Sequence, residues 1–218
     1  MTEFPDELLS GYRAFKDGRY EREQNRYRHL ADQGQTPETM IIACCDSRAA
    51  PETIFDSAPG EIFVMRNVAN LVPPYEPDGA FHATSAALEY AVQSLKVKHI
   101  VVLGHARCGG IGAVLNPAAE PLSPGDFIGK WMNLISPAAS ALPSSGLSPA
   151  EKQTELERAS LRQSIANLRT FPCVHILEDR NRLALHAAWF DISDGDLWVM
   201  DAETGEFTKT KTSGISNN

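Results

Sequence analysis

The sequence has no excess of basic residues and no apolar run long enough to cross a membrane. Among its 218 residues, 20 are Lys or Arg and 28 are Asp or Glu, so its formal net charge is −8. A nucleic-acid or acidic-membrane surface favours clustered Lys and Arg, and a membrane helix needs about 20 consecutive apolar residues. We therefore expect no nucleic-acid partner and no membrane, but a small-molecule substrate or a second copy of the chain.

Cysteine is also scarce, with four residues in the chain. The segment Met1 to Leu9 carries acidic residues and no apolar core, unlike a secretory or transit peptide, so we expect a cytoplasmic protein. Disulfide frameworks are rare in the cytoplasm, and cysteines in motifs there are more often metal ligands or catalytic groups. The length and the lack of internal repeats favour one domain, 1–218, with a helical arm (1–34), a catalytic α/β core (35–207) and a polar tail (208–218).

Three short apolar runs predict the centre of the core: Thr39–Cys44, Glu61–Arg66 and His99–Leu103. Such continuous runs are typical of strands buried on both faces, and hence of parallel strands. Between the second and third runs, Thr84–Leu95 has apolar residues every three or four positions, which predicts a helix. The alternation indicates an α/β fold with a mostly parallel central sheet flanked by helices.

The flanking segments complete this prediction. The N-terminal segment predicts two amphipathic helices split at Gly18, an arm whose apolar face must be covered. Near the C-terminus, Asp194-Gly195 is a hairpin signal that predicts an antiparallel addition to the sheet. We also expect a short helix at Phe127–Ile135, a helix from a capping box at Ser148 to about Leu168, and a strand at Cys173–Leu177.

Two motifs follow the ends of predicted strands: Cys44-Cys45-Asp46-Ser47-Arg48, and His105 with Cys108. Sites in parallel sheets form beyond the carboxyl ends of the strands. Two thiolates and one imidazole supply three ligands of a tetrahedral zinc and leave the fourth position for water. Because neighbouring side chains at a strand end point to opposite faces, we select Cys44 over Cys45, which also leaves Asp46 on the metal side.

The same residues allow other interpretations. Cys44, His105 and Cys108 could form a structural zinc site with Cys45 or Asp46 as the fourth ligand. Asp46 and Ser47 could instead only cap a helix. In that case the chain would be a noncatalytic, zinc-stabilised binding protein. An intact Asp46–Arg48 pair argues against this alternative, because a purely structural zinc site does not need it.

The joint motif Cys44-x-Asp46-Ser47-Arg48 and His105-x-x-Cys108-Gly109-Gly110 resembles the β-class carbonic anhydrases. The segments 66–70, 89–92 and 127–131 also resemble that family, especially its plant-type branch, whereas Cys45 stands where the family usually has a small polar residue. The resemblance implies one Zn²⁺ per subunit and reversible hydration of carbon dioxide to bicarbonate and a proton. Zinc hydroxide would be the nucleophile, oriented by an Asp46–Arg48 dyad.

The resemblance also implies a substrate pocket and an assembly. Phe63, Val68 and Tyr90 match residues that line the pocket, and Gln35 matches an amide that bonds the substrate oxygen. The backbone of Gly109 offers a further donor. Part of the pocket would come from a neighbouring subunit, so we expect a homo-oligomer, dimer or tetramer, with the dimer as the smallest complete enzyme. In some members the residue matching Asp46 becomes the fourth zinc ligand in a closed state, and related proteins hydrolyse carbonyl sulfide or carbon disulfide instead.

Overall fold

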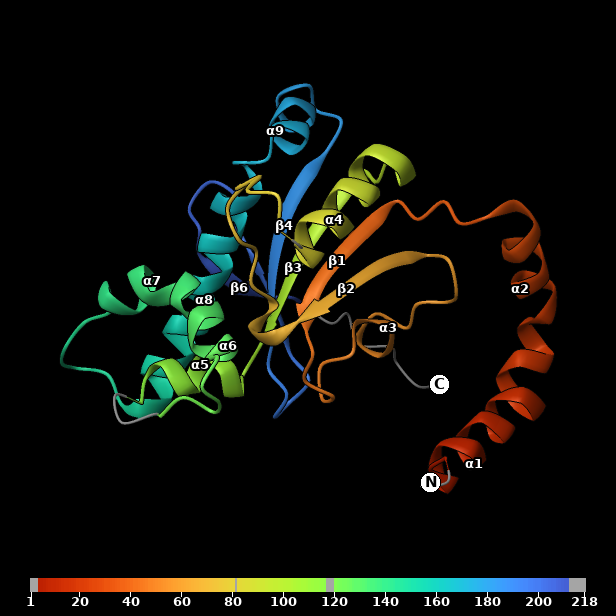
Figure 1. The fold of residues 1–218 in the computed structure, drawn as a ribbon, viewed down its shortest axis with the longest axis horizontal. Coiled ribbons are helices and arrows are strands. Elements are labelled where there is room, and N and C mark those ends of the chain that lie inside the picture. The colour runs from red at the N-terminus through yellow and green to blue at the C-terminus, as the bar shows by residue number, and fades with distance from the viewer. Residues whose placement is uncertain (1–3, 81, 117–119, 212–218) are drawn as a thin grey trace.

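The computed structural model describes residues 4–80, 82–116 and 120–211, which build the α/β fold predicted from the sequence (Figure 1). Six strands form one sheet in the order β2-β1-β3-β4-β5-β6. The first four strands in this order are mutually parallel, and β5 and β6 add in antiparallel fashion. The strands are β1 (Thr39–Cys44), β2 (Ile62–Asn67), β3 (His99–His105), β4 (Ala184–Phe190), β5 (Leu197–Met200) and β6 (Phe207–Lys209).

The α-helices are α1 (Asp6–Phe15), α2 (Glu21–Gln33), α3 (Pro51–Ile54), α4 (Ala83–Glu89), α5 (Gly109–Val114), α6 (Phe127–Met132), α7 (Ser136–Ser140), α8 (Pro149–Leu168) and α9 (Pro172–Asp179). Two π-helical segments, η1 (Lys16–Tyr20) and η3 (Tyr90–Leu95), extend α1 and α4, and 3₁₀ turns occur at η2 (Val68–Asn70) and η4 (Asn133–Ile135). No helix of the described ranges is both long and apolar enough to span a membrane. The cytoplasmic location stays a prediction.

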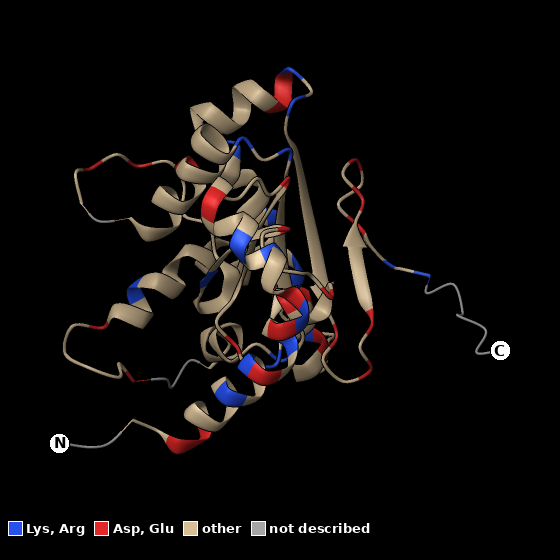
Figure 2. Ribbon diagram, turned by 90° about the vertical axis from the view of Figure 1, so that its right-hand side faces the viewer, with Lys and Arg blue, Asp and Glu red and all other residues tan. Residues whose placement is uncertain are grey.

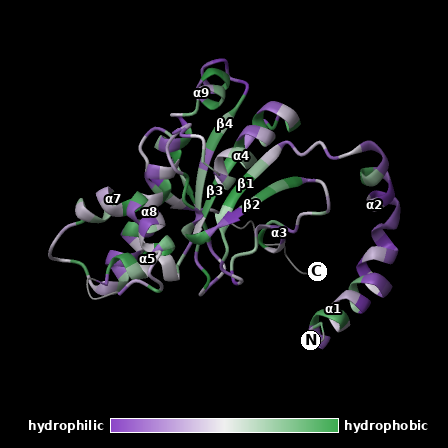
Figure 3. Cartoon of the chain, in the orientation of Figure 1, coloured by the Kyte–Doolittle hydropathy of each residue, from purple (hydrophilic) through white to green (hydrophobic). Residues whose placement is uncertain are grey.

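The central strands β1 and β3 are buried on both faces over most of their length, as is typical of parallel strands, whereas the edge strand β2 is only partly buried. Figure 3 shows the hydropathy of the residues along the strands. Alternate residues of β1 enter different clusters: Met40 and Ile42 pack into the main core, whereas Ile41 and Ala43 pack on the opposite face. The main core also takes side chains from α4, η3 and α8. This packing fixes the register of β1, because a shift of one residue would exchange its two faces.

The N-terminal arm differs from the prediction of two helices split at Gly18. Helices α1, η1 and α2 run on without a break and extend beside the core, with acidic and basic residues interspersed along them (Figure 2). A glycine inside a helix costs only about 1 kcal/mol. Here the rings of Phe15, Tyr20 and Tyr27 lie on both sides of Gly18 with centroids 5.2 to 6.0 Å apart, and this contact bridges the glycine.

The strand predicted at Cys173–Leu177 is wrong, because this segment belongs to helix α9. Pro172 occupies the first turn, where its fixed φ favours a helix. Val174 is fully buried and Leu177 packs against the same core, so the apolar positions are three apart, which is a helical spacing. A run of five residues was too short to distinguish this pattern from a strand.

The C-terminal boundary of the core also lies later than predicted, because Thr208 and Lys209 belong to β6 and not to a tail that begins at 208. Phe207 is buried in the main core and aligns β6 against β5. The other predictions for this half are confirmed: the hairpin joins β4 to β5, and the capping box between Ser148 and Glu151 opens α8.

Candidate active site

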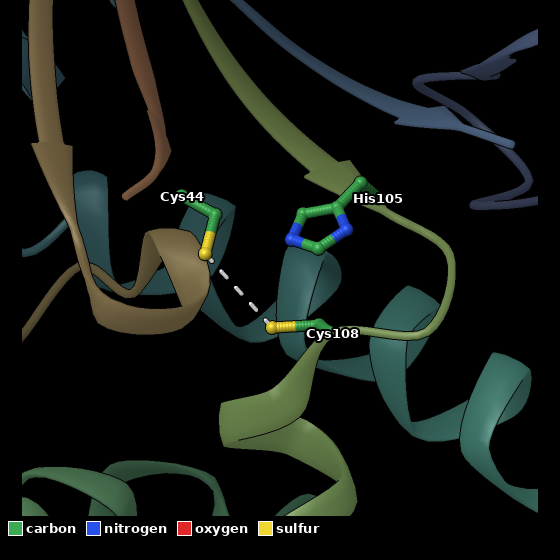
Figure 4. Close-up of side chains that lie close together, drawn as sticks. All are labelled: Cys44, His105 and Cys108. Carbon is green, nitrogen blue, oxygen red and sulfur yellow. Dashed lines mark hydrogen bonds between the residues drawn. The ribbon is translucent and has the colours of Figure 1, made fainter. Parts of the chain in front are cut away.

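The side chains of Cys44, His105 and Cys108 meet at the carboxyl end of the parallel sheet (Figure 4). Cys44 ends β1 and His105 ends the adjacent strand β3, while Cys108 precedes α5. The two sulfur atoms lie 4.0 Å apart, and one ligand atom from each residue lies within 4.8 Å of the others. All three residues are buried, and both cysteines belong to a small apolar core with residues of α5 and α6.

The atoms of this cluster fit a zinc ion. His105 Nδ1 donates to the carbonyl oxygen of Ala106 at 2.9 Å, which turns Nε2 toward the two sulfurs. Nε2 is buried and has no hydrogen-bond partner among the described residues. A buried polar atom without a partner calls for an explanation, and a metal bound by sulfur, nitrogen and sulfur supplies one. Cys45 is exposed and lies outside the cluster.

The two cysteines are strongly coupled to each other. The hydrogen bond with the Cys108 thiol lowers the pKa of Cys44 below its ordinary value. The same contact, with burial, raises the pKa of Cys108 well above its ordinary value. Cysteine binds metals as the thiolate, so a dication at this position would favour the deprotonated form of both side chains.

Asp46 and Arg48 form a close ion pair beside the cluster. Arg48 donates from Nε and Nη2 to the two carboxylate oxygens at 2.9 and 2.7 Å, and its backbone N–H donates at 2.9 Å. These bonds, chiefly those from the guanidinium, hold the pKa of Asp46 well below its usual range. One carboxylate oxygen lies 3.8 Å from His105 Nε2. The site thus places an ionised carboxylate next to the candidate metal position.

Two residues that support the cluster were not assigned a role from the sequence. Arg66, at the end of β2, donates to the carbonyl oxygens of Cys44 and Asp46 at 2.8 and 2.7 Å. Glu157, in α8, is 2% exposed and accepts a hydrogen bond from the backbone N–H of Cys108 at 3.0 Å. One sign in the sequence indicates that Glu157 is buried: it lies four residues before Leu161, on the apolar face of the helix.

The predicted pocket residues separate into two groups within one chain. Val68 lies beside the helix that follows Cys108, because a Cβ atom at Gly110 would lie 3.1 Å from its side chain. Val68 and Arg66 also line a cavity of about 710 Å³. Gly109 opens α5 with an exposed backbone.

Phe63 and Tyr90 form the second group. Their ring centroids lie 5.8 Å apart. Phe63 precedes Asn67, the β2 residue paired with Cys44, by four residues, or about 13 Å along the strand. Gln35 is exposed just after the arm. The fold of a single chain therefore does not bring this group to the cysteines.

Comparison with known proteins agrees with this geometry. The carbonic anhydrase family model matches residues 39–197. Beta carbonic anhydrase 3 of Arabidopsis thaliana is 36% identical over 208 residues, which cover 91% of this chain and 78% of that protein. The solved structure of the β-carbonic anhydrase CcaA has a TM-score of 0.80 at 27% identity, covering 95% of this chain and 92% of that one. A tetrameric β-carbonic anhydrase from Sordaria macrospora has a TM-score of 0.74 at 28% identity, with 93% and 98% covered.

Proposed function

Because this chain belongs to the β-carbonic anhydrase family and is a carbonic anhydrase, we propose that it hydrates carbon dioxide reversibly at one zinc ion held by Cys44, His105 and Cys108. The observation that carries the proposal is the buried, unpartnered Nε2 of His105, which faces two sulfurs beside an ionised carboxylate. The products are bicarbonate and a proton. A purely structural zinc site has no need of that carboxylate.

Zinc, when bound, would lower the pKa of a water molecule so that it attacks carbon near neutral pH. Asp46 accepts a hydrogen bond from the attacking oxygen and so directs a lone pair at the carbon of the substrate. Arg48 keeps Asp46 ionised and fixes its orientation through the two guanidinium bonds. The backbone N–H of Gly109, at the exposed start of α5, is a donor for the substrate oxygen.

The pairing of Asp46 with Arg48 also bears on the resting state. Both carboxylate oxygens are engaged by the guanidinium. Each oxygen keeps a further lone-pair site, so the paired carboxylate could accept a hydrogen bond from the attacking water or, in a closed state, bind the ion itself. Arg48 fixes the orientation of the carboxylate from which either state would form.

We also propose that the working enzyme is a homo-oligomer with the dimer as its smallest complete unit. Leu8 and Tyr12 lie four residues apart on one face of α1 and are 60% and 58% exposed, so they form an uncovered apolar stripe of the arm, and Phe4, just before the helix, is 62% exposed. A second chain would cover this stripe. It would also supply the Phe63–Tyr90 pair, which lies too far along β2 to reach the cysteines of its own chain.

The test is stopped-flow hydration of carbon dioxide by purified protein whose zinc content has been measured. We expect one zinc per chain and activity that disappears when a chelator removes the metal and returns when zinc is added. Zinc-loaded protein without hydration would refute the proposal and favour a binding protein. Rapid hydrolysis of carbonyl sulfide with slow hydration of carbon dioxide would refute it in favour of the hydrolase alternative.

A further inference from the structure

Helix α8 carries a polar network that faces the cysteine at the start of α5. The helix packs against β3 and β4, behind the strand that ends in His105. Gln153 and Glu157 are four residues apart in α8 and so lie on the same side of the helix. Both side chains contact the backbone of Cys108. The network thus links the α8 layer to one of the candidate zinc ligands.

The two backbone polar groups of Cys108 are both bound by this network. Its N–H donates to Glu157 Oε1 at 3.0 Å, and its carbonyl oxygen accepts from Gln153 Nε2 at 3.1 Å. Gln153 Nε2 also donates to Glu157 Oε1 at 3.0 Å. From β4, Trp189 Nε1 donates to Glu157 Oε2 at 3.0 Å. The carboxylate therefore accepts three hydrogen bonds from three different segments of the chain.

The hydrogen bonds from Gln153 and Glu157 to Cys108, which we call the Cys108 clamp, hold a strained segment of backbone in place. Arg107 has a φ of 56°, in the left-handed region that residues other than glycine rarely adopt. Such a conformation persists only where the surroundings over-determine it. On one side, Arg48 Nη2 donates to the carbonyl oxygen of Arg107 at 3.2 Å, and on the other side Glu157 and Gln153 hold Cys108. The turn between His105 and Cys108 is thus held from both sides.

We infer that Glu157 is a positioning residue, which presets the Cys108 backbone so that its sulfur meets the Cys44 sulfur and His105 Nε2 in a geometry ready for the metal. The inference rests on the proposed zinc site. A carboxylate suits this position because all its partners are donors and it has no proton to offer them. A glutamine would present its NH₂ group either to the Cys108 N–H or to the Trp189 indole N–H, so one of these bonds would be lost.

The test compares Glu157→Gln with Glu155→Gln, a control that makes the same change two residues away in α8, outside the network. The zinc dissociation constant is measured by competition with a chromophoric chelator. Disruption of the partners that orient metal ligands typically weakens binding about 10- to 100-fold, and we expect this range for Glu157→Gln. We also expect a changed thiolate-to-metal charge-transfer spectrum after loading with cobalt(II), which a general loss of stability would not produce. Glu155→Gln should match the parent chain in both measurements.

Equal zinc affinity and equal cobalt spectra in the two variants would overturn the inference. If Glu157→Gln does not fold, Gln153→Met serves instead, because it removes the bond to the Cys108 carbonyl while Glu157 stays in place. A severalfold weaker zinc affinity in that variant supports the clamp, and an unchanged affinity overturns it. Failure of the proposed function has a different signature, since the parent chain and Glu155→Gln would then also bind no zinc or hydrate no carbon dioxide.

Discussion

Replacement of Asp46 by asparagine is the sharpest test of the proposed dyad. Asp46 accepts three hydrogen bonds from Arg48, one from the backbone and two from the guanidinium. Asparagine keeps the size of the side chain but removes the charge, and its NH₂ group cannot accept from Arg48. The attacking oxygen would lose its charged acceptor. The three candidate zinc ligands are untouched, so metal binding should persist.

The expected loss of activity in Asp46→Asn follows from the proposed role of Asp46 as the acceptor for the attacking oxygen. A positioned acid–base group contributes about 10²- to 10⁴-fold to a rate. We therefore expect kcat/KM of Asp46→Asn to fall about 10²- to 10⁴-fold, which corresponds to about 2.7 to 5.4 kcal/mol of transition-state stabilisation. Stability should change by less than about 1 kcal/mol, because the Arg48 side chain is 52% exposed and water screens the pair.

The assay is stopped-flow hydration of carbon dioxide with a pH indicator, on protein of measured zinc content, from pH 6 to 9. Because Arg48 holds the pKa of Asp46 well below its usual range, Asp46 is ionised throughout this interval. The control is Asp56→Asn, an exposed residue with a φ of 46°, a conformation that asparagine tolerates. Zinc-loaded Asp46→Asn with parental activity would refute the dyad.

Three further predictions concern the core, the charge balance and the assembly. Phe207→Ala should lower the free energy of unfolding in urea by about 3 to 5 kcal/mol and Thr208→Ala by less than about 0.5 kcal/mol; equal small losses would contradict the placement of β6. Burial and the neighbouring His99 lower the pKa of His186, so the folded state binds fewer protons than the unfolded state and stability should fall as pH drops below about 6.5. In His99→Gln, the urea midpoint of unfolding should fall less between pH 7 and pH 5 than in the parent chain. An equal fall in both proteins would count against an electrostatic effect of His99 on His186. Leu8→Asp should shift the protein toward the monomer in sedimentation velocity, whereas an unchanged mass would show that the arm stripe is not an interface.

Much of the sheet and the position of the cluster could be predicted because local sequence carried the information. The three apolar runs are continuous, which is typical of strands in the centre of a parallel sheet. Cys44 and His105 are the last residues of two such strands, and the strand ends of a parallel sheet lie at one edge. The alternation of side chains then separates the buried Cys44 from the exposed Cys45.

The remaining features depend on contacts that no local pattern contains. The helix at α9 and a strand have the same apolar content over five residues, and burial of Val174 against the main core decides between them. The arm continues through Gly18 because three aromatic rings pack across it. Glu157 lies 49 positions from Cys108, so its role emerges only when α8 packs on the sheet.

The sequence distance between the two halves of the cluster links metal supply to folding. Cys44 and Cys108 are 64 positions apart and come together only after β1 has paired with β3. An ion that needs both halves binds the folded chain and not the unfolded one. Above the dissociation constant, each tenfold rise in free zinc then adds about 1.4 kcal/mol to the stability of the folded state. A low concentration of free zinc would thus destabilise the folded chain and also remove its activity.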